Sequence, residues 1–138
     1  MSSPNLHQST SLADLAHLVE RVNVKSPELY TRAVSGATLL LTGAVTPTAD
    51  DLTGFAVRGS AAEPYAVNLG ADGPPCTCPD ATRRGVEWHG KVYCKHTFAG
   101  LMFARLQALA VERNRRNRVL RLLPYRRARR PIRVAASA

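Results

Sequence analysis

Apolar residues near the start of the chain recur at helical spacing. Between Ser11 and Val22 the pattern fits one amphipathic helix, with Ser11 suited to the N-cap and Asp14 close to the positive end of the helix dipole. The apolar positions that define this period are Leu12, Leu15, Ala16, Val19 and Val22. The pattern predicts a first helix that ends near Val22.

A second helix start follows a few residues later. Ser26 suits an N-cap and Pro27 suits the first helical position, while Gly36 supplies a stop signal. These residues predict a second helix from Pro27 to about Ser35. We expect this helix to bury Leu29, Ala33 and Tyr30.

The spacing of the apolar residues then changes to that of strands. A mostly apolar run covers residues 38–45, and apolar residues alternate with others in 55–59 and in 65–69. Turn-forming residues separate the three runs, and a Gly- and Pro-containing cluster at 72–75 follows the last of them. The pattern predicts three strands in an antiparallel meander.

The helical period returns after Cys94. It continues through Leu109 and runs on to Leu123, where Pro124 stops it. These elements predict an α+β fold, with two N-terminal helices, a small antiparallel three-stranded sheet, a connecting loop and a long C-terminal helix. We divide the chain into a flexible N-terminus (1–10), an N-terminal helical segment (11–36), a central domain (37–110) and an arginine-rich extension (111–138).

Charge is distributed unevenly along the chain. The protein has 138 residues and a formal net charge of +9, yet acidic and basic side chains balance over residues 1–110. The whole excess comes from residues 111–138, which hold ten arginines and one acid, Glu112. Because guanidinium groups bind phosphates in a bidentate manner, a neutral body with this extension indicates a polyanionic partner such as nucleic acid.

All three cysteines lie close together in the sequence. Cys76 and Cys78 form a C-x-C pair, and after fifteen intervening residues Cys94 and His96 form a C-x-H pair. Zinc takes four tetrahedral ligands, and three cysteines with one histidine are a standard closed structural set. Each pair acts as a chelate, so that the long loop between the pairs is closed only once. The spacing predicts one structural zinc ion bound by Cys76, Cys78, Cys94 and His96.

Other roles for these residues stay open at this point. Free cysteines are often buried apolar residues, although the polar, proline-flanked sequence around these three does not predict a core. A disulfide between Cys76 and Cys78 would close a strained small ring. Cys94 and His96 are two residues apart, which rarely suits a nucleophile and its base. His89 is an alternative fourth metal ligand in place of His96.

The stretch from residue 55 to about 102 resembles a SWIM zinc finger. That family's pattern is C-x-C, a variable loop and C-x-H, preceded by short strands and followed by a helix, and this chain has Cys-Thr-Cys-Pro-Asp at 76–80 and Cys-Lys-His at 94–96. Residues 86–93 make the loop longer than in compact members of the family. The resemblance covers about a third of the chain. It implies the same four zinc ligands and a role in binding DNA or proteins.

The sequence therefore leads us to expect a zinc-binding module that binds DNA or RNA through its C-terminus. Neutralising about six to ten phosphates would make such binding strongly dependent on salt. The arginines expected to contact nucleic acid are Arg113, Arg115, Arg116, Arg118, Arg121, Arg126, Arg127, Arg129, Arg130 and Arg133.

Alternatives to nucleic-acid binding come from other function classes. The zinc finger and the exposed leucines near Leu120 also suit an adaptor for an acidic or helical protein partner within a larger complex. The arginine-rich extension also suits a solvated segment that aids solubility or targeting. A membrane-surface role is weaker, because no sustained apolar face opposes the arginines.

We expect neither catalysis nor insertion into a membrane. The sequence outside the cysteine motif has no paired carboxylates, no phosphate-binding glycine loop and no nucleophile with a base. It also has no apolar stretch of the length that a membrane span needs and no signal-peptide pattern. We therefore expect the protein in the cytoplasm, with association to a nucleoid or ribosome, or in the nucleus of a eukaryote.

Overall fold

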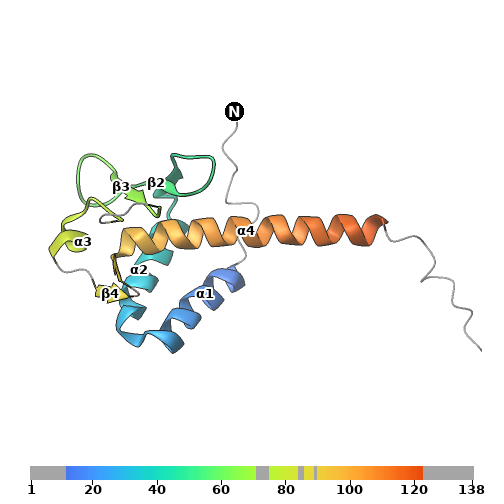
Figure 1. Cartoon of the computed structure of the whole chain (residues 1–138), viewed down its shortest axis with the longest axis horizontal. Coiled ribbons are helices and arrows are strands. Elements are labelled where there is room, and N and C mark those ends of the chain that lie inside the picture. The colour runs from blue at the N-terminus through green and yellow to red at the C-terminus, as the bar shows by residue number, and fades with distance from the viewer. Residues whose placement is uncertain (1–11, 71–74, 84–85, 89, 123–138) are drawn as a thin grey trace, which may run out of the picture.

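A computed structural model describes residues 12–70, 75–83, 86–88 and 90–122 (Figure 1). Its helices are α1 (Leu12–Lys25), the 3-10 turn η2 (Pro27–Leu29), α2 (Tyr30–Leu41), α3 (Pro79–Arg83) and α4 (Lys95–Leu122). Its strands are β1 (Val45–Pro47), β2 (Gly54–Val57), β3 (Tyr65–Asn68), β4 (Val86–Trp88) and β5 (Lys91–Tyr93). The predicted α+β fold is confirmed, with a three-stranded antiparallel sheet and a long C-terminal helix. Within the described ranges, no helix has the length and apolar character needed to cross a membrane.

The predicted end of the second helix at Gly36 is wrong. Helix α2 continues to Leu41, and Gly36 is buried inside it against α4. A Cβ atom at Gly36 would lie 2.8 Å from the Lys95 carbonyl oxygen and 2.8 Å from the Phe98 Cβ. Gly36 is therefore a point of close approach between two helices, which is why the residue occurs inside α2 at some cost in helix propensity.

The glycine that terminates α2 is Gly43, two residues after the last helical residue, Leu41. Its φ of 74° is in the left-handed region. The Gly43 N–H donates to the Leu40 carbonyl (3.2 Å), and the Ala44 N–H donates to the Leu39 carbonyl (3.0 Å). This is the Schellman arrangement, which satisfies the last carbonyls of a helix.

The predicted strand over 38–45 is also wrong, because its first half belongs to α2. Ala33, Ala37 and Leu40 are buried at intervals of four and three residues, so the apolar run continues the helical period, and β1 begins only at Val45. The expected burial of Tyr30 is wrong as well, since this side chain is 40% exposed. Leu29 and Ala33 are buried as predicted.

The predicted antiparallel meander is confirmed in the order β1-β2-β3. Phe55 of β2 lies opposite Pro47 of β1 and Val67 of β3. Because side chains alternate along a strand, Phe55, Val57 and Val67 all point into the core, where each is no more than 2% exposed. The sheet packs on α4 through Phe55 and Phe103, whose ring centroids are 5.4 Å apart.

Helix α4 is the central element of the fold. Its first three turns are packed by α2, α1 and the sheet, and the buried residues of the helix end at Leu106. The helix then continues to Leu122, in agreement with the sequence pattern, and Figure 1 shows it extending well beyond the other elements. Only the N-terminal part of α4 therefore belongs to the packed body of the protein.

Candidate metal centre

The first cysteine pair lies along the free edge of β3. Cys76 forms an isolated antiparallel bridge with Val67. The Thr77 N–H donates to the Ala66 carbonyl (3.1 Å), and the Ala66 N–H donates to the Thr77 hydroxyl oxygen (3.1 Å). Thr77 thus contributes both backbone and side chain to this edge. These bonds fix the C-x-C segment against the sheet and turn Cys76 and Cys78 inward, where each is 1% exposed.

Cys78 also stands at the start of a helix. The Ala81 N–H, in the first turn of α3, donates to the Cys78 Sγ at 3.3 Å. The sulfur therefore takes the place of an oxygen N-cap and satisfies one free amide of the helix. An N–H directed at the sulfur favours its thiolate form over the thiol.

A β-hairpin connects α3 to the second ligand pair. Strands β4 and β5 pair so that Val86 lies opposite Tyr93 and Trp88 opposite Lys91. Gly90 has a φ of 73°, a left-handed conformation that tight hairpin turns require and that glycine adopts readily. The segment 86–93, which was expected to lengthen the loop, therefore carries two paired strands, and β5 leads directly to Cys94.

The Cys94 sulfur lies at the start of α4 in the same way that the Cys78 sulfur lies at the start of α3. The Thr97 N–H lies 3.4 Å from the Cys94 Sγ and the Thr97 hydroxyl lies 3.3 Å from it. His96 is in the first turn of the same helix and is 3% exposed. Figure 1 shows α3, β4 and the start of α4 gathered at one end of the molecule, so that the two ligand pairs meet there.

The structure brings the four predicted ligands together. The ligand atoms of Cys76, Cys78, Cys94 and His96 all lie within 4.8 Å of one another, and all four residues are buried. The His96 Nδ1 is 3.9 Å from the Cys94 Sγ. A tetrahedral zinc ion places its sulfur ligands about 3.8 Å apart. The cluster thus has the composition and nearly the spacing of a four-coordinate site that holds one metal ion.

Burial and mutual contacts shift the pKa values of the three thiols of the cluster. A hydrogen bond from Cys76, assisted by His96 and Thr97, lowers the pKa of Cys94. The same contact with Cys94, together with burial, raises the pKa of Cys76. Burial also raises the pKa of Cys78. A cation at the centre would offset the cost of forming the thiolates of Cys76 and Cys78, whose pKa values are raised.

Two further observations fit a bound cation. The His96 Nε2 is buried and has no hydrogen-bond partner among the described residues, as expected for an imidazole near a site that holds a cation. All three cysteines are free thiols, which argues against the disulfide considered from the sequence.

The three cysteines are also part of the hydrophobic core, which the polar sequence around them did not predict. His89, the alternative ligand, lies outside the described residues.

Sequence reasoning missed the residues that support His96. The Tyr65 ring of β3 lies 4.7 Å from the imidazole, centroid to centroid. A Cβ at Gly59 would be 2.6 Å from the Tyr65 ring and 3.0 Å from the His96 Nε2. Neither residue belongs to the cysteine motif, so only the pairing of the strands could have revealed them.

The predicted nucleic-acid contacts occupy different environments. Arg113 forms an ion pair with Asp14, and Arg115 and Arg116 are paired with Glu112 on their own helix. Arg118 and Arg121 are exposed, and no ion pair within the described ranges includes them. The remaining arginines lie outside the described residues: Arg126, Arg127, Arg129, Arg130 and Arg133.

The chain matches no protein-family model, and no curated protein or solved structure is detectably similar to it. The fold and the site together define an α+β protein with a buried cluster of three cysteines and one histidine that is placed to hold one metal ion.

Proposed function

We propose that this protein is a SWIM-type zinc-binding module that binds nucleic acid, DNA or RNA, through its arginine-rich C-terminus. The observation that carries the metal part is the convergence of Cys76, Cys78, Cys94 and His96, with all four ligand atoms within 4.8 Å and shielded from solvent. The donor set of three thiolates and an imidazole favours zinc over the hard cations, which prefer oxygen.

The proposed role of zinc is structural. Cys76 and Cys78 are attached to the edge of β3, while Cys94 and His96 belong to the start of α4. Bound zinc would supply the cross-link that fixes the sheet edge to this helix. Four protein ligands leave no open position for a water molecule or substrate, and we therefore propose a non-catalytic module.

Support for nucleic-acid binding comes from the charge and exposure of α4. Beyond Glu112, every described residue of the helix is exposed, and this stretch carries Arg113, Arg115, Arg116, Arg118 and Arg121. The sequence beyond the helix adds five more arginines and no acid. A cationic rod fixed to a zinc-stabilised body suits sequence-independent contact with a phosphate backbone.

The test compares the full chain with a chain truncated after Asn114. The cut keeps Arg113, which forms the ion pair with Asp14, and removes the nine other arginines of the extension, from Arg115 to Arg133. Binding to duplex DNA, single-stranded DNA and structured RNA is measured across a salt series. We expect the full chain to lose about 10³- to 10⁵-fold in affinity between low and moderate salt, as for six to ten phosphate contacts.

The truncated chain should keep its metal content and thermal unfolding and lose nucleic-acid binding. A full-length variant with glutamine in place of Arg118 and Arg121 is the intermediate case, and its salt slope should decrease by about two. Equal binding of truncated and full-length chains to all three nucleic acids would contradict the proposal. A metal-to-protein ratio near zero in freshly purified protein would contradict its zinc part.

A further inference from the structure

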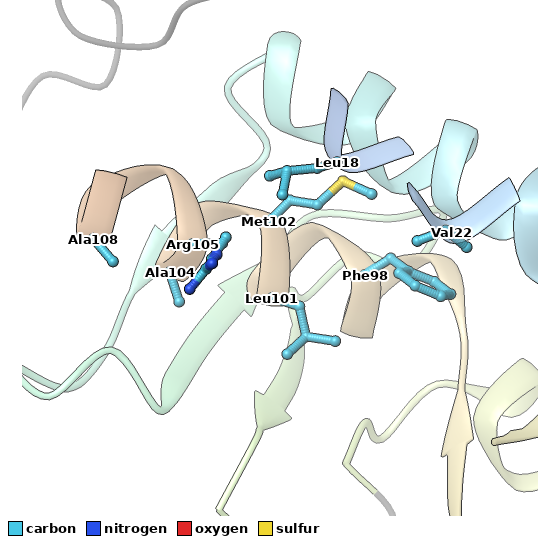
Figure 2. Close-up of a pocket in the computed structure, with 8 residues that line it drawn as sticks. All are labelled: Leu18, Val22, Phe98, Leu101, Met102, Ala104, Arg105 and Ala108. Carbon is cyan, nitrogen blue, oxygen red and sulfur yellow. The ribbon is translucent and has the colours of Figure 1, made fainter. Parts of the chain in front are cut away.

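An apolar groove of about 450 Å³ lies between α1 and α4, and none of the four clustered metal ligands lines it. Figure 2 shows Met102 beside Leu18 and Phe98 near Val22, with Arg105 and Ala108 farther along α4. The residues that line the groove are Leu18, Val22, Phe98, Leu101, Met102, Ala104, Arg105 and Ala108. The body of the protein therefore presents an apolar depression between two helices.

The charge in the lining of this groove is positive, and the face beyond it has a basic excess. Arg105 is the one charged residue in its lining, it is exposed, and no ion pair within the described ranges includes it. Farther along α4, a second hollow is lined by Glu112, Arg115, Arg116, Val119 and Leu120. Residues of both hollows recur along α4 at intervals of three and four, which places them on one face of the helix: Leu101, Arg105, Ala108, Glu112, Arg115 and Val119. The groove thus continues as one helical face with alternating apolar and mostly basic positions.

We propose that this face binds an amphipathic helix of a partner protein, with an apolar stripe flanked by acidic residues. A groove between two helices accepts the ridge of a third helix, whose apolar side chains recur at i, i+3, i+4 and i+7. Acidic residues beside that stripe would pair with Arg105 and with the basic excess at Arg115 and Arg116. The proposal does not depend on metal binding or on nucleic-acid binding.

Charge argues for such a partner over the other candidate occupants. Residues 123–138 carry five arginines and no acid, so their charge has the same sign as the groove. Residues 1–11 carry no Asp, Glu, Lys or Arg, and they contain one leucine, which does not make a helical stripe. A second copy packed face to face would oppose Arg105 and its neighbours to similar cations. An acidic amphipathic helix is the occupant that complements both properties of the face.

The probe is a displayed library of helical peptides about 14 residues long, a length at which a helix is marginally stable alone and gains order on binding. A leucine stripe is fixed, and the flanking positions vary among Glu, Gln and Lys. The library is selected on the immobilised full chain, and selected peptides are synthesised for affinity measurements. We expect enrichment of Glu at the flanks. Lack of enrichment, or enrichment of Lys, would overturn the proposal.

Groove variants locate the binding site. L101D and A108W should each weaken a selected peptide about tenfold or more, since they charge or fill the groove. L41D introduces the same chemical change at a leucine that is 52% exposed on α2, and it should leave affinity within about twofold. R105E, at an exposed site that does not threaten folding, should shift the selected flanks from Glu toward Lys. The proposal would be overturned if a selected peptide bound A108W as tightly as the wild type. It would also be overturned if the wild-type protein formed a dimer that A108W dissociates, because a second copy would then occupy the groove.

Discussion

Asp14 of α1 and Arg113 of α4, which are 99 residues apart in the sequence, form a two-point ion pair. The Arg113 Nη1 lies 2.6 Å from the Asp14 Oδ2, and the Nη2 lies 2.7 Å from the Oδ1. The Asp14 side chain is only 15% exposed. Such a fork combines charge with fixed geometry. It attaches α1 to the point where α4 leaves the packed body, so Arg113 has a structural partner as well as its predicted role in contacting phosphate.

The first prediction concerns the pH dependence of this pair. The hydrogen bond and charge of Arg113 lower the pKa of Asp14 below its ordinary value of 3.8. A lowered folded-state pKa stabilises the fold at pH values above 3.8, and this contribution is lost as the pH falls through the folded-state value. D14N should therefore have a lower Tm than the wild type at pH 7, and the two Tm values should converge on acidification.

A double-mutant cycle separates the pair from unrelated effects. D14N, R113Q and the double variant are unfolded thermally at pH 7 and near pH 3. We expect positive coupling at the higher pH and smaller coupling at the lower one, because protonation of Asp14 removes the ion pair. Destabilisation by D14N that is the same at both pH values would show that Asp14 acts through something other than its charge.

The second prediction concerns the metal ligands. H96A should bind zinc about 10²-fold more weakly or worse, because one of the four contributions to a binding free energy of about 10–16 kcal/mol is lost. Binding is measured by competition with a chromophoric chelator, and Tm is measured with and without chelator. Acidification should release the metal from the wild type, since the thiolates must be free of protons to bind it.

The matched control for H96A is H17A, because His17 is exposed on α1 and outside the cluster. H17A should keep the wild-type metal stoichiometry of one ion per chain and the wild-type response to chelator. If H96A bound metal as tightly as H17A, the fourth ligand would have to come from elsewhere, and His89 would be the next histidine to replace.

The sequence predicted those features that depend on residue type and local spacing. The C-x-C and C-x-H pairs identified the four clustered residues, and the alternation in β2 and β3 predicted the meander. The apolar period after Cys94 predicted a helix that runs on to Leu123, and α4 extends to Leu122 at the end of the described residues. These signals are local because a chelate pair, a strand and a helix each impose their own short repeat.

The features that the sequence did not reveal depend on contacts between distant segments. Gly36 and Gly43 are the same residue type, and only packing against α4 distinguishes a close approach from a helix end. In the sequence, nothing distinguishes Arg113 from the other arginines of the extension, and only the fold places Asp14 opposite it. The hairpin over 86–93 was likewise hidden, because its short strands carry little alternation of their own.

The third prediction concerns the crossing of α2 and α4. Alanine in place of glycine within a helix is usually favourable by about 1 kcal/mol. At Gly36 the added methyl would meet the Lys95 carbonyl oxygen and the Phe98 Cβ at 2.8 Å, and the Ala99 backbone nitrogen at 2.9 Å. Since two of these three atoms are backbone atoms, the helices must separate. G36A should therefore destabilise the fold by about 1–3 kcal/mol in urea unfolding.

The neighbouring substitution S35A is the control for G36A. It changes an adjacent position of α2 without adding volume at the crossing, and its effect should lie within about 0.5 kcal/mol. If G36A were as stable as S35A or more so, the helices would not approach as closely as the structure indicates.

The last prediction concerns Gly59, which links the sheet to the metal centre. A Cβ there would be 2.6 Å from the Tyr65 ring and 3.0 Å from the His96 Nε2, so G59V must displace one ring or both. Groups that position a metal ligand typically change affinity by about 10- to 100-fold, and we expect G59V to weaken zinc binding by about tenfold. The matched control is G70A, whose new Cβ would have ordinary contact, 3.7 Å from the Asn68 Oδ1. Zinc affinity is measured for both variants by chelator competition. If G59V and G70A bound zinc equally well, the position of His96 would not depend on the packing of Gly59 and Tyr65, and the imidazole would be held by α4 alone.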